Sequence, residues 1–155
     1  MAKIFYYCFA GVHSSVVAAS IHLGKLPSDR VPSLRELTGM PAFDRKSDNS
    51  LGTPYFFGRD EQDNEVYVLG LGGNPRFMLE VIAHFLQSRP GLDTLDWKFF
   101  DALSTINFLA KMGGFISQRL KGYALGRWIT AAGIRGSYVR LVDLVTTVRR
   151  CNRLW

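Results

Sequence analysis

The residues with the clearest chemical potential lie together near the N-terminus, in the run Cys8-Phe9-Ala10-Gly11-Val12-His13-Ser14-Ser15. Gly11 permits a tight turn, and the two serines stand where a helix would begin. Free N–H groups and the positive end of the helix dipole make such a position a site for anions, and hydroxyl groups add donors. The spacing therefore predicts a phosphate-binding loop that uses Gly11, His13, Ser14 and Ser15.

Cys8 and His13 are the candidate catalytic residues of this loop. A thiol near a helix N-terminus loses its proton more easily, so Cys8 could act as a nucleophile. His13 could act as an acid or base, donate a hydrogen bond to phosphate or bind a metal. The alternative is that Cys8 is a small buried apolar side chain and that Ser14 and Ser15 only cap the helix.

The elements that would position this loop are a strand, a glycine turn and a helix. Residues 4–9 are aromatic and β-rich, which predicts a buried strand. Residues 14–23 are apolar and are followed by Gly24, which is typical of a helix and its C-terminal end. Residues 25–53 are rich in turn formers, with one short helix expected at 33–37 and an exposed loop at 44–49.

Strand and helix patterns alternate along the rest of the chain. Residues 55–57 and 66–69 flank a hydrophilic turn and predict a β-hairpin. Asn74 and Pro75 suit the start of an amphipathic helix that runs to about residue 88. Further along, we expect a strand at 97–103, an apolar helix at 106–120, a final strand at 127–132 and a helix that opens at 136–137.

This order predicts an α/β fold, in which a three-layer, mostly parallel sheet carries the β-hairpin as an elaboration. One domain would span residues 1–155. Ligands of such sheets bind beyond the carboxyl ends of the strands, so we expect four loops along one binding edge: 8–15, 70–76, 101–105 and 133–137.

Other residues on the expected edge are weaker candidates. Gly72, Gly73 and Arg76 form a second loop that could face phosphate, although its glycine spacing does not match a dinucleotide-binding fingerprint. Asp101 could hold Mg²⁺ or act as a base, or it could simply cap the chain that follows it. Additional positive charge for the anion is expected from Arg76, Arg127 or Arg135.

The remaining histidines carry less chemical information. His22 lies near a predicted helix C-terminus, where a structural role is favoured, and His84 falls at the solvent boundary of an amphipathic helix. No spacing of Cys and His resembles a zinc site, so we predict no metal.

The net charge of +6 is unevenly distributed. Residues 1–104 carry 10 basic and 12 acidic side chains, whereas residues 105–155 carry 9 basic side chains and Asp143 alone. This asymmetry predicts either a solvated basic face or an anionic partner such as nucleic acid, a membrane surface or an acidic protein.

Composition also limits the class of protein. No apolar stretch reaches the roughly 20 residues that a transmembrane helix needs. Cys8 and Cys151 are the only cysteines, which excludes a disulfide scaffold, and no export signal opens the chain. These features predict a cytoplasmic protein, with homo-oligomers an open alternative.

The run from Cys8 to Ser15 resembles the phosphocysteine loop of sugar-phosphotransferase IIB subunits, in which a cysteine at a strand end is followed by Ala-Gly and a Ser/Thr-Ser pair. It is similar, less closely, to the loop of low-molecular-weight tyrosine phosphatases. Ser14 stands where those phosphatases need an arginine, which counts against their chemistry. A Walker A loop would have a glycine in place of Cys8 and a lysine in place of Ser14, so the run does not match that motif. The resemblance implies a phosphate cradle and covers only this loop.

Over its whole length, the chain resembles an uncharacterised domain-of-unknown-function family from spore-forming Gram-positive bacteria. The segments that carry the resemblance are Tyr6-Tyr7-Cys8, Gly11, His13-Ser14-Ser15-Val16, Ile21-His22-Leu23-Gly24, Asn64-Glu65-Val66-Tyr67 and Gly113-Gly114-Phe115. This resemblance implies a single domain and no particular activity.

Together these patterns predict a protein that binds a phosphorylated small molecule or nucleotide at the Cys8–Ser15 loop. Phosphoryl transfer is the reaction that Cys8 or His13 could carry, and the sequence leaves open whether the protein is an enzyme. No cofactor is indicated. The alternative is a non-catalytic interaction protein whose basic C-terminal third contacts an anionic partner.

Overall fold

The fold is built on a four-stranded sheet with the strand order β2-β3-β1-β4. The computed structural model describes residues 1–44, 51–89, 91, 96–107 and 123–153. Strands β3 (Glu65–Gly70) and β4 (Trp97–Asp101) pair in parallel with β1 (Lys3–Cys8), and β2 (Tyr55–Arg59) pairs with β3 in antiparallel fashion. The predicted α/β class, the mostly parallel sheet and the hairpin are confirmed.

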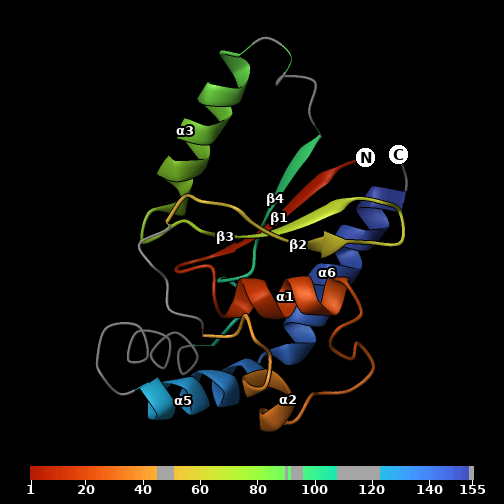
Figure 1. Ribbon diagram of the computed structural model, residues 1–155, viewed down its shortest axis with the longest axis vertical. Helices are drawn as coiled ribbons and strands as arrows, with labels where there is room; N and C mark the ends of the chain where they lie inside the picture. Colours follow the sequence, from red (N-terminus) through yellow and green to blue (C-terminus); the bar gives the residue numbers. More distant parts are fainter. Residues whose placement is uncertain (45–50, 90, 92–95, 108–122, 154–155) are drawn as a thin grey trace.

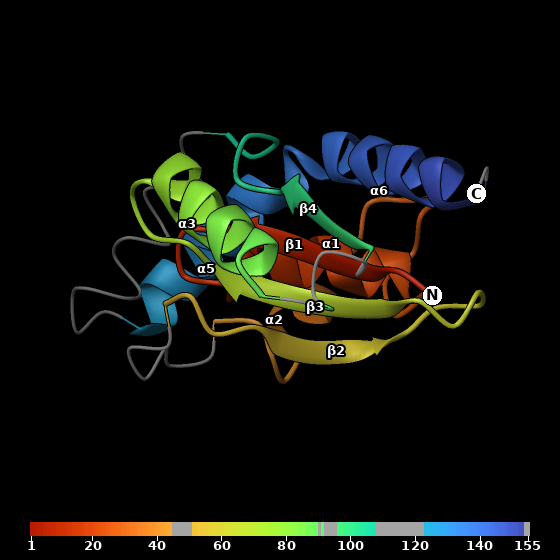
Figure 2. The same cartoon turned by 90° about the horizontal axis from the view of Figure 1, so that it is seen from above.

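Helices lie on both sides of this sheet (Figures 1 and 2). The helices are α1 (Ser14–His22), α2 (Leu34–Thr38), α3 (Pro75–Gln87), α5 (Tyr123–Arg135) and α6 (Tyr138–Arg153). Helices α1 and α6 pack together on one face, and α3 rises from the opposite face (Figure 2).

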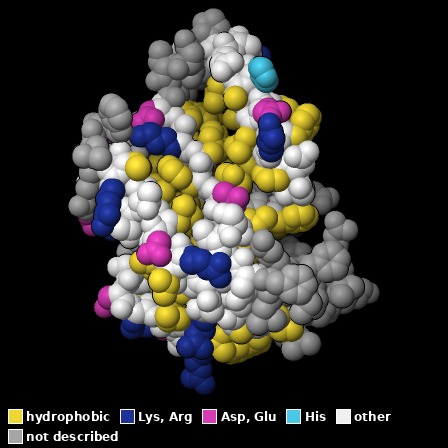
Figure 3. Space-filling model, turned by 180° about the vertical axis from the view of Figure 1, so that it is seen from behind, with side chains coloured by type: hydrophobic (Ala, Val, Ile, Leu, Met, Phe, Trp, Pro, Cys, Tyr) yellow, Lys and Arg dark blue, Asp and Glu magenta, His cyan; other side chains and the backbone are white. Residues whose placement is uncertain are grey.

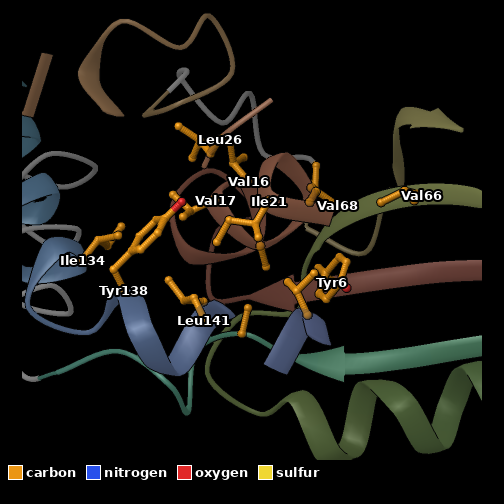
Figure 4. Packing of buried hydrophobic residues seen from close by; sticks show 14 of the residues in the cluster. Tyr6, Val16, Val17, Ile21, Leu26, Val66, Val68, Ile134, Tyr138 and Leu141 are labelled. Atoms are coloured by element: carbon orange, nitrogen blue, oxygen red, sulfur yellow. The ribbon is translucent and has the colours of Figure 1, made fainter. Parts of the chain in front are cut away.

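The main core lies between the sheet and the α1–α6 layer (Figure 4). Alternate residues of β1 and β3 point into it because successive side chains of a strand face opposite sides. Every residue of α1 is buried. The face of α6 predicted from helical spacing is buried as expected, and it consists of Tyr138, Leu141, Val145 and Val148.

The other sheet face carries a row of aromatic side chains across all four strands. Phe56 lies opposite Tyr67, Tyr67 opposite Phe5, and Phe5 opposite Phe99 in the strand register. The ring centroid of Phe5 lies 4.9 Å from that of Tyr67 and 4.7 Å from that of Phe99, and both pairs are stacked. Such cross-strand pairs stabilise the sheet beyond its backbone hydrogen bonds.

Helix α3 does not close this aromatic face as a core helix would. None of its residues is buried, and Phe77, Val81 and Phe85 are each about half exposed. Hydrophobic side chains run from α3, at the top of Figure 3, towards the middle of the molecule. An amphipathic helix ordinarily turns its apolar stripe inwards, so this stripe is the least covered apolar surface of the described helices.

Local signals explain where two helices begin and where a third one ends. Ser33 and Glu36 form a reciprocal capping box at the start of α2. The side chain of Asn74 accepts a hydrogen bond from the Phe77 N–H, and Pro75 occupies the first turn of α3. Gly24 follows the C-cap of α1 with a φ of +67°, the left-handed conformation that glycine adopts easily.

The strand predicted at residues 127–132 is wrong, because this segment belongs to helix α5. The buried residues of α5 recur at helical spacing and are Gly126, Thr130, Ala131, Gly133 and Ile134. A short apolar run fits a buried strand or a buried helix equally well, and packing against α2 decides between them here. Residues 106–107 are not helical, and the rest of the helix predicted at 106–120 lies outside the described residues.

Candidate functional site

Three of the four predicted loops lie along one edge of the sheet. Strands β1, β3 and β4 are parallel and end at Cys8, Gly70 and Asp101, so their carboxyl ends share this edge. The fourth predicted loop, 133–137, follows no strand, because residues 133–135 belong to α5 and only residues 136–137 join α5 to α6. Its predicted place at the binding edge was wrong, because the segment before it, residues 127–132, is part of helix α5 and not a strand.

The first loop folds back closely onto the end of β3. The N–H groups of Leu71 and Gly72 donate hydrogen bonds to the carbonyls of Cys8 and Phe9, at 3.0 Å and 2.9 Å. Gly11 has a φ of +74°, and a Cβ atom there would lie 2.8 Å from the backbone nitrogen of Gly70. Glycine is therefore required at Gly11 both by conformation and by close approach.

The Cys8 sulfur receives two polar contacts from its own loop. The Gly11 N–H donates to Sγ at 3.2 Å, and the Ser15 hydroxyl lies 3.1 Å from the same atom. Cys8 is a free thiol and only 4% exposed. Only the Gly11 N–H is fixed as a donor to the sulfur, since either atom of the Cys8–Ser15 contact can donate. The structure thus brings Cys8, Gly11 and Ser15, three residues that the sequence analysis singled out, into direct contact.

The N-terminus of α1 is buried, and several of its polar groups have no hydrogen-bond partner among the described residues. Its N-cap residue, His13, makes no capping side-chain hydrogen bond. The N–H groups of Ser14, Ser15 and Val16 donate to no residue that the structure describes. The Ser14 Oγ atom is also buried with no partner in the described part of the chain, and Ser14 has no exposed surface. Buried donors of this kind normally bind something, so their arrangement suits an anion.

His13 pairs with Asp44, a residue that the sequence placed in an exposed loop. His13 Nε2 lies 2.8 Å from Asp44 Oδ1, and the ring edge of His13 meets Phe43. Asp44 is buried, so the prediction of an exposed loop was wrong at this position; residues 45–49 lie outside the described part. The one local signal for this burial is Phe43, a large apolar residue that draws its neighbour towards the core.

The second loop contributes its glycines to this region but not its arginine. Gly72 is buried and donates to the Phe9 carbonyl, and Gly73 is exposed at a place where a Cβ atom would lie 3.8 Å from the Phe9 ring. The side chain of Arg76 is 90% exposed and pairs with Glu80 one helical turn along α3. Arg76 is therefore directed along its own helix, and its predicted contact with an anion at the first loop has no support.

The other arginines expected near the anion hold the backbone instead. Arg127 donates to the carbonyl of Thr38, and Arg135 donates to the carbonyl of Pro32 at 2.9 Å. Both contacts tie α5 to the segment around α2. Asp101 accepts hydrogen bonds from the N–H groups of Leu103 and Ser104, which are the contacts of a capping residue.

His22 has the contacts of a structural histidine. Its Nδ1 lies 2.7 Å from the Tyr6 hydroxyl, and its Nε2 lies 3.1 Å from Asp60 Oδ2. Burial lowers the pKa of His22 below its ordinary value, and the hydrogen bond to Asp60 opposes that shift only in part. His84 is exposed on α3, near the solvent as the sequence predicts.

The described residues contain neither a metal-binding cluster nor a helix that could span a membrane. No group of three or more His, Cys, Asp or Glu side chains in this part of the chain is arranged to hold a metal ion. None of the described helices combines the length and the apolar character needed to cross a bilayer.

Comparison with known proteins identifies the family and nothing more specific. No curated protein and no solved structure matches the chain. The family model described as "Protein of unknown function (DUF3189)" matches residues 3–150, which is nearly the whole chain. This agrees with the whole-chain resemblance found in the sequence, and the protein belongs to the DUF3189 family.

Proposed function

We propose that this protein binds a phosphorylated small molecule or a nucleotide at the loop from Cys8 to Ser15. The observation that carries the proposal is the buried N-terminus of α1, where backbone donors and the Ser14 hydroxyl have no partner among the described residues. A phosphate group has enough acceptor oxygens to satisfy several such donors at once, and the helix dipole favours its charge.

Phosphoryl transfer is the reaction to which the residues of this loop are suited. In that step the bond from phosphorus to the leaving oxygen breaks as a bond to Cys8 Sγ or to a ring nitrogen of His13 forms. The contacts of Cys8 with Gly11 and Ser15 support the sulfur as acceptor. A reduced thiol is needed for this role, which agrees with the proposed cytoplasmic location.

The test is a thermal-shift panel of inorganic phosphate, sugar phosphates and nucleotides on the wild type and on Ser14→Ala. A ligand at 100 times its Kd should stabilise the wild type by about 2.7 kcal/mol. Ser14→Ala removes a buried hydroxyl without a partner, so the variant should be at least as stable as the wild type without ligand and should lose most of the ligand's effect. Ser28→Ala, at an exposed serine, is the matched control.

Two outcomes would contradict the proposal. Either no compound of the panel stabilises the wild type, or Ser14→Ala and Ser28→Ala respond to the ligand equally. Intact-mass measurement after incubation with the stabilising compound tests the transfer step, because Cys8→Ser or His13→Gln should abolish a phosphoryl adduct. The predicted alternative, a basic interaction surface, would instead give salt-sensitive binding of polyanions that survives the serine change.

A further inference from the structure

We propose that Asp44 is a positioning residue that holds His13 as an acid–base group of the anion site, with Nδ1 as the ring nitrogen available to the ligand. The inference rests on the function proposed above for the loop from Cys8 to Ser15. It adds a residue that the sequence analysis did not place in the site.

The relative burial of the two side chains shows which of them lies deeper in the protein. The Asp44 side chain is 1% exposed and the His13 side chain is 10% exposed, so the carboxylate lies behind the imidazole. An ionised carboxylate only accepts hydrogen bonds, which requires the proton of neutral His13 to sit on Nε2. Nδ1 then carries a free lone pair, and it has no partner among the described residues.

Asp44 is also tied to the loop through its backbone. Its N–H donates to the Val12 carbonyl at 2.9 Å, next to His13 in the sequence. The φ of Asp44 is +56°, in the left-handed region that a residue other than glycine seldom adopts. Such a conformation persists where surrounding contacts enforce it, and such positions cluster at functional sites. Two independent contacts thus fix the carboxylate relative to the imidazole.

His13 is the side chain of the loop best placed for proton transfer. No Lys or Arg side chain of the described residues donates a hydrogen bond to residues 8–15. A histidine whose second nitrogen is held by a carboxylate keeps one tautomer and one orientation, which is what an acid–base residue needs. Nδ1 can accept a proton from a ligand hydroxyl or, once protonated, donate one to a phosphate oxygen.

The first measurement is independent of any ligand. Long-range ¹H–¹⁵N NMR of the full chain reports the tautomer of each neutral histidine. We expect His13 in the Nε2–H form, and we expect this preference to be lost in Asp44→Gly, which removes the carboxylate but tolerates the positive φ. Asp63→Gly is the matched control, because Asp63 also has a positive φ of 60° and lies in an exposed turn. A mixed or Nδ1–H tautomer of His13 in the wild type would overturn the inference.

The second measurement is the affinity for inorganic phosphate, by calorimetry, in the same variants. Asp44→Gly and His13→Gln should each weaken binding about tenfold, the lower end of the loss seen when the carboxylate that orients a metal-binding histidine is removed. The double variant should bind no more weakly than either single variant, because the two residues act as a unit. Asp44→Asn, which keeps an acceptor oxygen, should recover part of the loss.

The outcomes separate this inference from the proposed function. If the wild type and Asp44→Gly bound phosphate with equal affinity, the role of Asp44 would be overturned, but the proposed anion site would not. Absence of binding by the wild type to every compound of the panel would overturn both. Additive losses in the double variant would show that Asp44 does not act through His13.

Discussion

His13 and His22 lie at opposite ends of α1, and their contacts suit them to different roles. His22 has both ring nitrogens engaged, by Tyr6 and Asp60, and its side chain has no exposed surface. His13 has one nitrogen engaged, by Asp44, and is the more exposed member of its pair. An imidazole with one unengaged nitrogen can bind a ligand, whereas an imidazole with both nitrogens engaged has a structural role.

The buried His22 gives the stability of the protein a specific pH dependence. Its pKa is lowered in the folded protein, mainly by burial, whereas in the unfolded chain it titrates near 6.5. Between these two values the unfolded chain binds the extra proton. The contribution of His22 to the free energy of unfolding should therefore be constant above about pH 6.5 and should fall as the pH drops below it, by up to about 1.4 kcal/mol per pH unit.

Urea unfolding of the wild type and of His22→Gln between pH 5 and pH 7.5 checks this expectation. The slope should be smaller in His22→Gln and unchanged in the control His84→Gln, since His84 is exposed. The effect of Asp60 falls in a different pH range. The pKa of Asp60 is lowered in the folded protein, so its titration reduces stability only near and below about pH 4. An unchanged slope in His22→Gln would contradict the assignment.

At the scale of elements, helices α3 and α6 share an amphipathic pattern but not a role in the core. In α6 the apolar stripe of Tyr138, Leu141, Val145 and Val148 is buried, with Leu141 fully enclosed. In α3 the corresponding positions stay exposed, and Phe85 keeps 53% of its surface. Burial rather than pattern determines what a side chain contributes to stability, so equivalent substitutions in the two helices should differ.

Alanine substitutions should reveal this difference in the free energy of unfolding. Leu141→Ala should cost about 2 to 5 kcal/mol, because it leaves a cavity in the core. Phe85→Ala should cost about 1 kcal/mol or less, since most of that ring is already in contact with water. Val139→Ala, at a 63% exposed position of α6, is the control within the same helix. Equal losses for Leu141→Ala and Phe85→Ala would show that α3 is covered in solution.

At the scale of the whole molecule, helices cover the two faces of the sheet to different extents. One face carries the core between β1, β3, α1 and α6. On the other face the aromatic row of Phe56, Tyr67, Phe5 and Phe99 covers the strands, and α3 stands away from them. Local opening costs least where few apolar contacts are broken, so α3 should open without the rest of the fold.

Native-state hydrogen exchange measures this directly. Amides of the central strands β1 and β3 should exchange only through global unfolding, with the full dependence on denaturant. Amides of α3 should exchange through local opening, with a smaller protection factor and little dependence on low denaturant concentrations. Protection of α3 equal to that of β1 would contradict this expectation.

The predictable part of the site lies within a short stretch of sequence. A β-rich run, Gly11 and the two serines are neighbours in the chain, and their local conformational preferences suffice to predict a strand, a turn and a helix. The contact of Ser15 with Cys8 follows from that geometry, because the turn returns the helix to the strand end. What was missed at the site is Asp44, which lies 31 residues from His13.

Sequence alone determined the α/β class, the hairpin, the starts of α2 and α3, and the buried face of α6. Each depends on side-chain periodicity or on capping within a few residues, which are properties of the local chain. The tertiary structure decided that residues 127–132 are helical, that Arg127 and Arg135 bind carbonyls, and which carboxylate faces each buried histidine. Those outcomes depend on which surfaces pack together, because a buried polar group must find its partner wherever the fold brings one near.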